Sequence, residues 1–139
     1  MTDMYLSVSL EAKHDFDTDA VTRRLGVEPT QIRKFGTPIR PGHDALYKYS
    51  SWEWGTGHIS ADDAGALIAQ AAAVFQSRAA AMRELADECG GNWAIVLDGY
   101  VHSGKMPAVY LDRRFISFCA EIHAAILYDI RIAAGYTDD

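Results

Sequence analysis

The sequence of 139 residues predicts one α+β domain, with a mainly antiparallel sheet and helices packed on one of its faces. Several short segments alternate apolar and polar residues, as strands with one buried face do. A long alanine-rich segment instead has apolar residues at helical spacing. Glycine and proline clusters separate neighbouring strand segments and therefore indicate hairpins between them.

The first element is a strand over residues 4–10, where Met, Leu, Val and Leu alternate with other residues. Asp17 or Thr18 then caps a short helix that runs to Leu25, because a side-chain oxygen at this position accepts a hydrogen bond from the first turn. Gly26 supplies the left-handed residue that ends the helix.

Two further strands follow this helix. Residues 31–35 form a short strand, and residues 45–54 are the best strand candidate because they are rich in Tyr and Trp. Alternation divides the large side chains of 45–54 between two faces, with Leu46, Trp52 and Trp54 on one face and Tyr47 and Tyr49 on the other.

Ser60 is the predicted N-cap of a long helical segment that reaches Cys89. This segment contains no proline, and its many alanines favour helix. A break near residues 76–77 would divide it into two helices, and Gly90 and Gly91 end it.

The last third of the chain predicts a strand over residues 93–101 and a shorter strand over 108–111. Asp112 then caps a final helix. Residues 126–132 alternate Ile and Tyr with other side chains and form a closing strand, and residues 133–139 are expected to be a frayed tail.

These elements give the order β-α-β-β-α-β-β-α-β. Its first six elements follow the ferredoxin-like order β-α-β-β-α-β, and a further β-α-β unit extends them. No repeat or linker divides residues 1–139, so we expect a single domain.

Composition excludes several classes of protein. The chain is 49% hydrophobic and has a net charge of -6, which argues against disorder and against broad binding to nucleic acid or anionic membranes. No apolar run approaches the roughly 20 residues of a membrane span, and no signal-peptide pattern opens the sequence. Two cysteines, Cys89 and Cys119, cannot build a disulfide framework, so we expect a cytoplasmic protein.

A basic and aromatic region interrupts this acidic chain. Residues 21–50 contain six basic and two acidic residues, a net charge of +4, whereas residues 61–139 have a net charge of -5. Arginine beside Trp and Tyr is typical of sites for anions, nucleotides or acidic partners. The alternative is a solvated strand edge for the basic residues and core packing for Trp52. The predicted binding residues are Arg33, Lys34, Arg40, Tyr47, Tyr49, Trp52 and Trp54.

No pattern in the sequence supports catalysis or a metal or cofactor site. The five histidines form no HxxxH or HxH pair. Cys89 is expected at a helix C-terminus, where the dipole raises a thiol pKa, and Cys119 falls beside apolar helix positions. Residues 103–105 lack the remainder of a phosphate loop, and Asp15, Asp17 and Asp19 lack the glycine and glutamate of a calcium loop.

The stretch 25–30, Leu-Gly-Val-Glu-Pro-Thr, followed by Gly36 and by Ser51-Trp52, resembles the front half of a bacterial family, domain of unknown function 4279. The long helix, the strand after the glycine pair and a last strand with Tyr128-Asp129 in altered order are similar to its later part. The resemblance covers nearly the whole chain and implies no established activity. Small α+β families of this kind often look like immunity or partner-binding proteins, which is an analogy.

The sequence therefore predicts a non-enzymatic protein-binding module, immunity- or antitoxin-like, that uses residues 31–54. The alternative is a binding protein for a small anionic ligand or nucleotide, or an enzyme, with a pocket between the sheet and the loop 36–44. A homodimer that uses an apolar patch on the sheet or the alanine-rich helix is a third alternative.

Overall fold

The computed structural model describes residues 2–102 and 104–132 of the chain. The predicted frayed tail, 133–139, lies outside these residues. The elements, in chain order, are β1 (Thr2–Ala12), α1 (Thr18–Leu25), β2 (Gln31–Arg33), β3 (Ser50–Gly55), β4 (Ile59–Ala61), α2 (Gly65–Phe75), the 3₁₀ turn η1 (Gln76–Arg78), α3 (Ala79–Cys89), β5 (Asn92–Val101), α4 (Arg113–Glu121) and β6 (Ala125–Ile132).

The strands form a single sheet in the order β2-β3-β1-β5-β6. Every pairing in it is antiparallel except that of β5 with β6, which is parallel. The long strand β1 lies near the middle of the sheet, and β4 pairs antiparallel with its first residues, beyond the stretch that pairs with β3. The fold is therefore α+β, as predicted, with a mostly antiparallel sheet.

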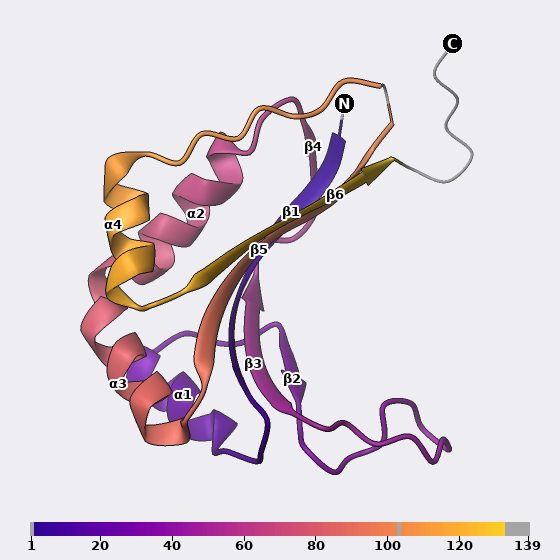
Figure 1. Ribbon diagram of the computed structural model, residues 1–139, viewed down its shortest axis with the longest axis vertical. Helices are drawn as coiled ribbons and strands as arrows, with labels where there is room; N and C mark the ends of the chain where they lie inside the picture. Colours follow the sequence, from indigo (N-terminus) through magenta and orange to yellow (C-terminus); the bar gives the residue numbers. More distant parts are fainter. Residues whose placement is uncertain (1, 103, 133–139) are drawn as a thin grey trace.

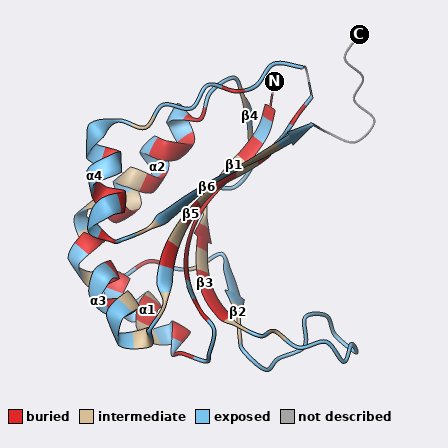
Figure 2. Cartoon of the chain, in the orientation of Figure 1, coloured by how far each residue is buried: buried red, intermediate tan, exposed pale blue. Residues whose placement is uncertain are grey.

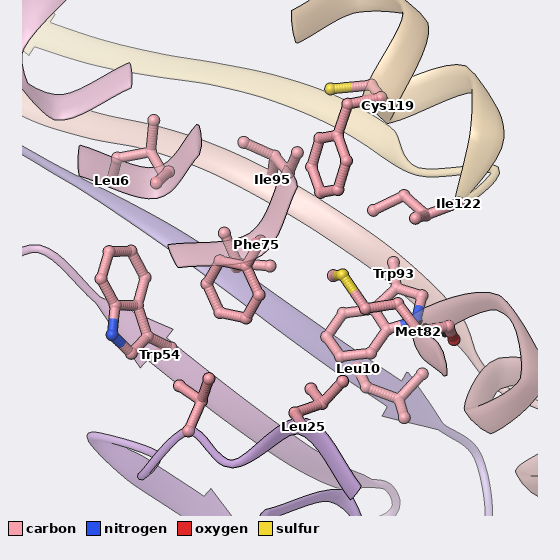
Figure 3. Packing of buried hydrophobic residues seen from close by; sticks show 14 of the residues in the cluster. Leu6, Leu10, Leu25, Trp54, Phe75, Met82, Trp93, Ile95, Cys119 and Ile122 are labelled. Carbon is pink, nitrogen blue, oxygen red and sulfur yellow. Dashed lines mark hydrogen bonds between the residues drawn. The ribbon is translucent and has the colours of Figure 1, made fainter. Parts of the chain in front are cut away.

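The helices all lie on one side of this sheet (Figure 1). Alternate residues of β1, Met4, Leu6, Val8 and Leu10, point towards the helices and are at most 2% exposed. Trp52 on β3 and Trp93 on β5 pack edge to face, with ring centroids 6.0 Å apart. Figure 3 shows the helical residues Phe75 and Met82 packed against this strand layer. No helix of the described residues lies on the opposite face of the sheet, here called the open face (Figure 1).

Local capping chemistry confirms three predicted helix ends. The Asp17 carboxylate accepts a hydrogen bond from the Ala20 amide at 3.1 Å, and Gly26 ends α1 in the left-handed conformation with φ of 67°. Asp112 caps α4 by accepting a hydrogen bond from the Phe115 amide at 2.8 Å. The predicted break near 76–77 is also confirmed, as η1 between α2 and α3.

Two predicted boundaries are wrong. Ser60 belongs to β4, where it pairs with Asp3, and α2 begins only at Gly65. The strand predicted at 108–111 is absent: Ala108 forms an isolated bridge with Asp63, and residues 109–111 belong to no strand. Both errors have one cause, since these short segments pair with partners that are distant in sequence rather than with a neighbour that their own pattern predicts.

The predicted strand 45–54 is also shorter than expected. Strand β3 begins at Ser50, and the residues before it belong to a segment that projects from the sheet. None of the helices in the described part of the chain combines the length and apolar character needed to cross a membrane.

Candidate functional site

The chain between β2 and β3 leaves the sheet as a projecting hairpin, residues 34–49, here called the arm. Main-chain hydrogen bonds hold its two sides together. The amide of Gly36 donates to the carbonyl of Tyr47, the amide of Tyr47 to the carbonyl of Thr37, and the amide of Ile39 to the carbonyl of Ala45, each at 2.9 Å. Figure 1 shows the arm at the lower right, extending away from the helices. The arm is therefore an ordered extension of the β2–β3 hairpin.

The root of the arm is tied to the turn between β1 and α1. The Lys34 ammonium donates to the Phe16 carbonyl at 3.0 Å and lies 3.0 Å from the Asp15 carboxylate. The Ser50 hydroxyl accepts a hydrogen bond from the Phe35 amide at 3.0 Å. The hydrogen bond from Lys34 holds the pKa of Asp15 below its usual value. These contacts fix the direction in which the arm leaves the sheet.

Large apolar side chains are exposed along the arm. Phe35, Ile39 and Leu46 are each 45–47% exposed. The rings of Tyr47 and Tyr49 pack edge to face beside them, with centroids 5.7 Å apart. A groove of about 880 Å³ runs along these five side chains, and the whole arm is mostly exposed in Figure 2. The arm thus presents a mainly apolar surface to solvent.

The predicted basic residues divide into two groups. Arg33 lies on the open face of the sheet, where it pairs with Glu53 at 3.4 Å, and Lys34 is held at the root of the arm. Arg40 and Lys48 are exposed on the arm itself, and no ion pair joins either side chain to another described residue. Arg40 and Lys48 are therefore the cations that the arm can offer to a partner.

Trp52 and Trp54, which were expected to bind a partner, belong to the core. Trp52 is 0% and Trp54 9% exposed, and both rings pack against Phe75 of α2. Their burial removes them from any surface site. The binding role expected of them is corrected to a structural one, because the side of β3 on which they lie faces the helices.

The sequence prediction missed Phe35, Ile39 and Leu46 as candidate binding residues. The sequence predicts Phe35 in a strand, Ile39 in the loop 36–44, and Leu46 on the same strand face as the two tryptophans. A signal was present, however, because Ile39 lies within the Pro- and Gly-rich stretch 38–42 and Leu46 shortly after it, where no strand or helix period could bury them.

A family model for a domain of unknown function, DUF4279, matches residues 2–133. The chain belongs to the DUF4279 family. The predicted resemblance is thereby confirmed, and the match extends from β1 through the arm to the end of β6. No curated protein and no solved structure matches the chain.

The open face of this DUF4279 chain has its own polar cluster. The Tyr5 hydroxyl donates to the Asp98 carboxylate at 3.2 Å, and the Tyr5 ring lies 4.6 Å from the His58 ring. Burial, followed by the neighbouring Asp98 carboxylate, raises the pKa of Tyr5. Among the described residues, no group of three or more His, Cys, Asp or Glu side chains could hold a metal ion.

Neither cysteine has the surroundings of an activated nucleophile. Burial raises the pKa of the Cys89 thiol and raises that of Cys119 to about 11. The sequence predicted the same direction at Cys89 from the helix dipole, whereas burial is the main cause and the neighbouring Glu88 carboxylate adds to it. His14 is close to Cys89, yet its ring Nε2 donates to the Cys89 carbonyl oxygen, at 2.6 Å.

Proposed function

We propose that this DUF4279 chain is a non-enzymatic protein-binding module, immunity- or antitoxin-like, that docks its partner along the arm. One observation supports this most: Phe35, Ile39 and Leu46 are nearly half exposed on a hydrogen-bonded hairpin that leaves the sheet. Large apolar and aromatic side chains supply most of the affinity of protein interfaces. An ordered arm also loses little conformational entropy when it binds.

The charges on the arm suggest the chemistry of the partner. Arg40 and Lys48 flank the apolar side chains, whereas Asp44 is the single carboxylate of residues 34–49. The matching surface would be apolar at its centre and acidic at its rim. Rim charges would mainly speed association, and this contribution would weaken as salt increases.

The alternative, a pocket for a small anionic ligand between the sheet and the loop 36–44, has less support. It requires an arginine beside Trp52 or Trp54. The groove on the arm is lined by neither tryptophan and by no arginine; its charged lining residues are Lys48 and Asp44, which offset each other, and Arg33 is already paired with Glu53. This lining favours a protein surface over an anionic small molecule.

We also propose two finer assignments. The β1-α1-β2-β3 segment followed by the helical segment and β5 is ferredoxin-like, which the antiparallel order β2-β3-β1-β5 supports. The chain works in the cytoplasm of a bacterial cell, where its free thiols Cys89 and Cys119 would remain reduced.

The test is capture of the tagged full chain from its own host, followed by native mass spectrometry. Wild type is compared with a Phe35→Ser, Ile39→Ser, Leu46→Ser variant and with Ile116→Ser, which alters a similarly exposed residue on α4. We expect wild type and Ile116→Ser to retain the same protein, which the arm variant loses. Circular dichroism checks that each variant is folded.

The salt dependence of association provides a second test of the proposal. We expect Arg40→Ala with Lys48→Ala to slow association with the captured protein and to reduce its dependence on salt. A captured protein that binds the arm variant as well as wild type would overturn the proposal. An adduct of small, defined mass in place of a protein would favour the ligand alternative.

A further inference from the structure

The two edges of the sheet are protected to very different extents. At one edge, β2 is only three residues long and leads directly into the arm. At the other edge, β6 is eight residues long and pairs with β5, its only partner among the described strands. Natural proteins usually shorten an edge strand or place proline or charged side chains, especially lysine, in it. The β6 segment, residues 125–132, contains no proline or lysine, and its two charged side chains, Asp129 and Arg131, are hydrogen-bonded to each other.

Strand β6 is also rich in exposed apolar side chains. Ile126, Leu127, Tyr128 and Ile132 are between 44% and 63% exposed, and Figure 2 shows most of the strand as exposed. Val109, in the segment before α4, lines a small apolar cavity together with Ile126 and Tyr128. A long apolar edge of this kind is a template for pairing with another strand.

The charges on β6 are self-complementary. Asp129 and Arg131 lie on the same face of the strand, two residues apart, and Arg131 donates two hydrogen bonds to the Asp129 carboxylate, at 3.1 and 2.7 Å. A two-fold axis through Ile130 would place Asp129 directly opposite Arg131 of a second copy, and Arg131 opposite Asp129 of that copy. Opposite charges at directly facing positions stabilise an antiparallel strand pair.

Other registers of the two strands do not place Asp129 opposite Arg131. An axis through Asp129 would set two carboxylates opposite each other, which is destabilising. An axis through Tyr128 would leave Asp129 opposite Leu127 and Arg131 opposite Ala125. The axis through Ile130 instead pairs residues 128–132 of the two copies and places Tyr128 opposite Ile132 on the face that the helices cover, so that apolar side chains meet there.

We propose that β6 pairs antiparallel with β6 of a second copy of this chain, with the two-fold axis at Ile130, to form one sheet that continues through both copies. The interface is isologous, as in most soluble dimers. It goes beyond the proposed function, because it leaves the arm of each copy, at the opposite edge of the sheet, free for another partner.

The test uses charge reversal and analytical ultracentrifugation of the full chain across the micromolar range. Wild type should form a dimer. Asp129→Arg gives two positive charges on each copy and Arg131→Asp two negative charges, so each variant alone should dimerise about tenfold more weakly or not at all. The control, Arg83→Glu on an exposed position of α3, should dimerise as wild type does.

Two rescue experiments distinguish a disrupted interface from a folding defect in the single variants. A mixture of Asp129→Arg with Arg131→Asp should form a heterodimer, since opposite charges again face each other, and the double swap in one chain should restore the homodimer. A wild type that stays monomeric, a single variant that dimerises normally, or a mixture that stays monomeric would overturn the proposal. A captured protein that binds the arm variant as well as wild type, while the dimer forms as expected, would contradict only the proposed function.

Discussion

The indole nitrogen of Trp52 donates a hydrogen bond to the hydroxyl oxygen of Thr22, at 3.0 Å. This bond joins β3 to α1 in the core, since Trp52 is completely buried. This hydrogen bond and its burial explain why Trp52, although tryptophan is common in binding surfaces, has a structural role here. A buried indole N–H needs an acceptor, and Thr22 supplies it.

Thr22→Val should destabilise the fold by about 1–3 kcal/mol, because it leaves the buried indole N–H without an acceptor. Thr22→Ser keeps the hydroxyl and should cost less. Urea unfolding at neutral pH measures both free energies. An equal loss in the two variants would contradict a stabilising role for the hydrogen bond.

Cys119 should make stability fall at alkaline pH. Burial raises its pKa to about 11 in the folded chain, whereas an unfolded thiol has a pKa of about 8.5. The contribution is therefore fully present below about pH 8.5 and is lost as the pH rises towards 11, up to about 3 kcal/mol. Urea unfolding at pH values from 7 to about 10 should show a steeper decline for wild type than for Cys119→Ala. Parallel curves would contradict this assignment.

The ion pair at the root of the arm should weaken in acid. The pKa of Asp15 is lowered by its hydrogen bond from Lys34, so its stabilising contribution is present above the unfolded value of about 3.9 and is lost as the pH falls through the lower, folded value. Thermal unfolding should show that Asp15→Asn melts below wild type at neutral pH and that the difference shrinks in acid.

Lys34→Met tests the same ion pair by removing its other member. Because each substitution removes the same ion pair, the effects of Asp15→Asn and Lys34→Met should not add in the double variant. Additive effects, or a melting difference that does not change with pH, would show that the pair does not stabilise the arm.

Local chemistry predicted much of this fold. Helix ends were predicted correctly where a single side chain or glycine determines them, as Asp17, Gly26 and Asp112 do. Strand β4 and residues 108–111 were assigned wrongly because a few residues have no reliable period, and their pairing depends on β1 and on Asp63, respectively. A pairing between distant segments leaves little trace in either segment alone.

The candidate site was predicted only in part. Its position between β2 and β3 followed from the cluster of basic and aromatic residues. The alternation over 45–54 nevertheless led to a wrong strand boundary. It continues from the arm into β3, although the arm residues face solvent and the tryptophans of β3 lie in the core. The ion pairs of Arg33 with Glu53 and of Lys34 with Asp15 depend on tertiary structure. Only the structure could therefore show that Arg40 and Lys48 are the arm's cations without an ion pair to another described residue.

The most direct test of the arm as the binding surface is photo-crosslinking in the native host. A photoreactive phenylalanine analogue replaces Ile39 on the arm or, as a control, Ile116 on α4, which is similarly exposed. Denaturing electrophoresis then measures the covalent adducts. We expect one adduct of defined protein mass from the Ile39 position and none from the Ile116 position. No adduct from the arm, or the same adduct from both positions, would contradict the arm as the binding surface.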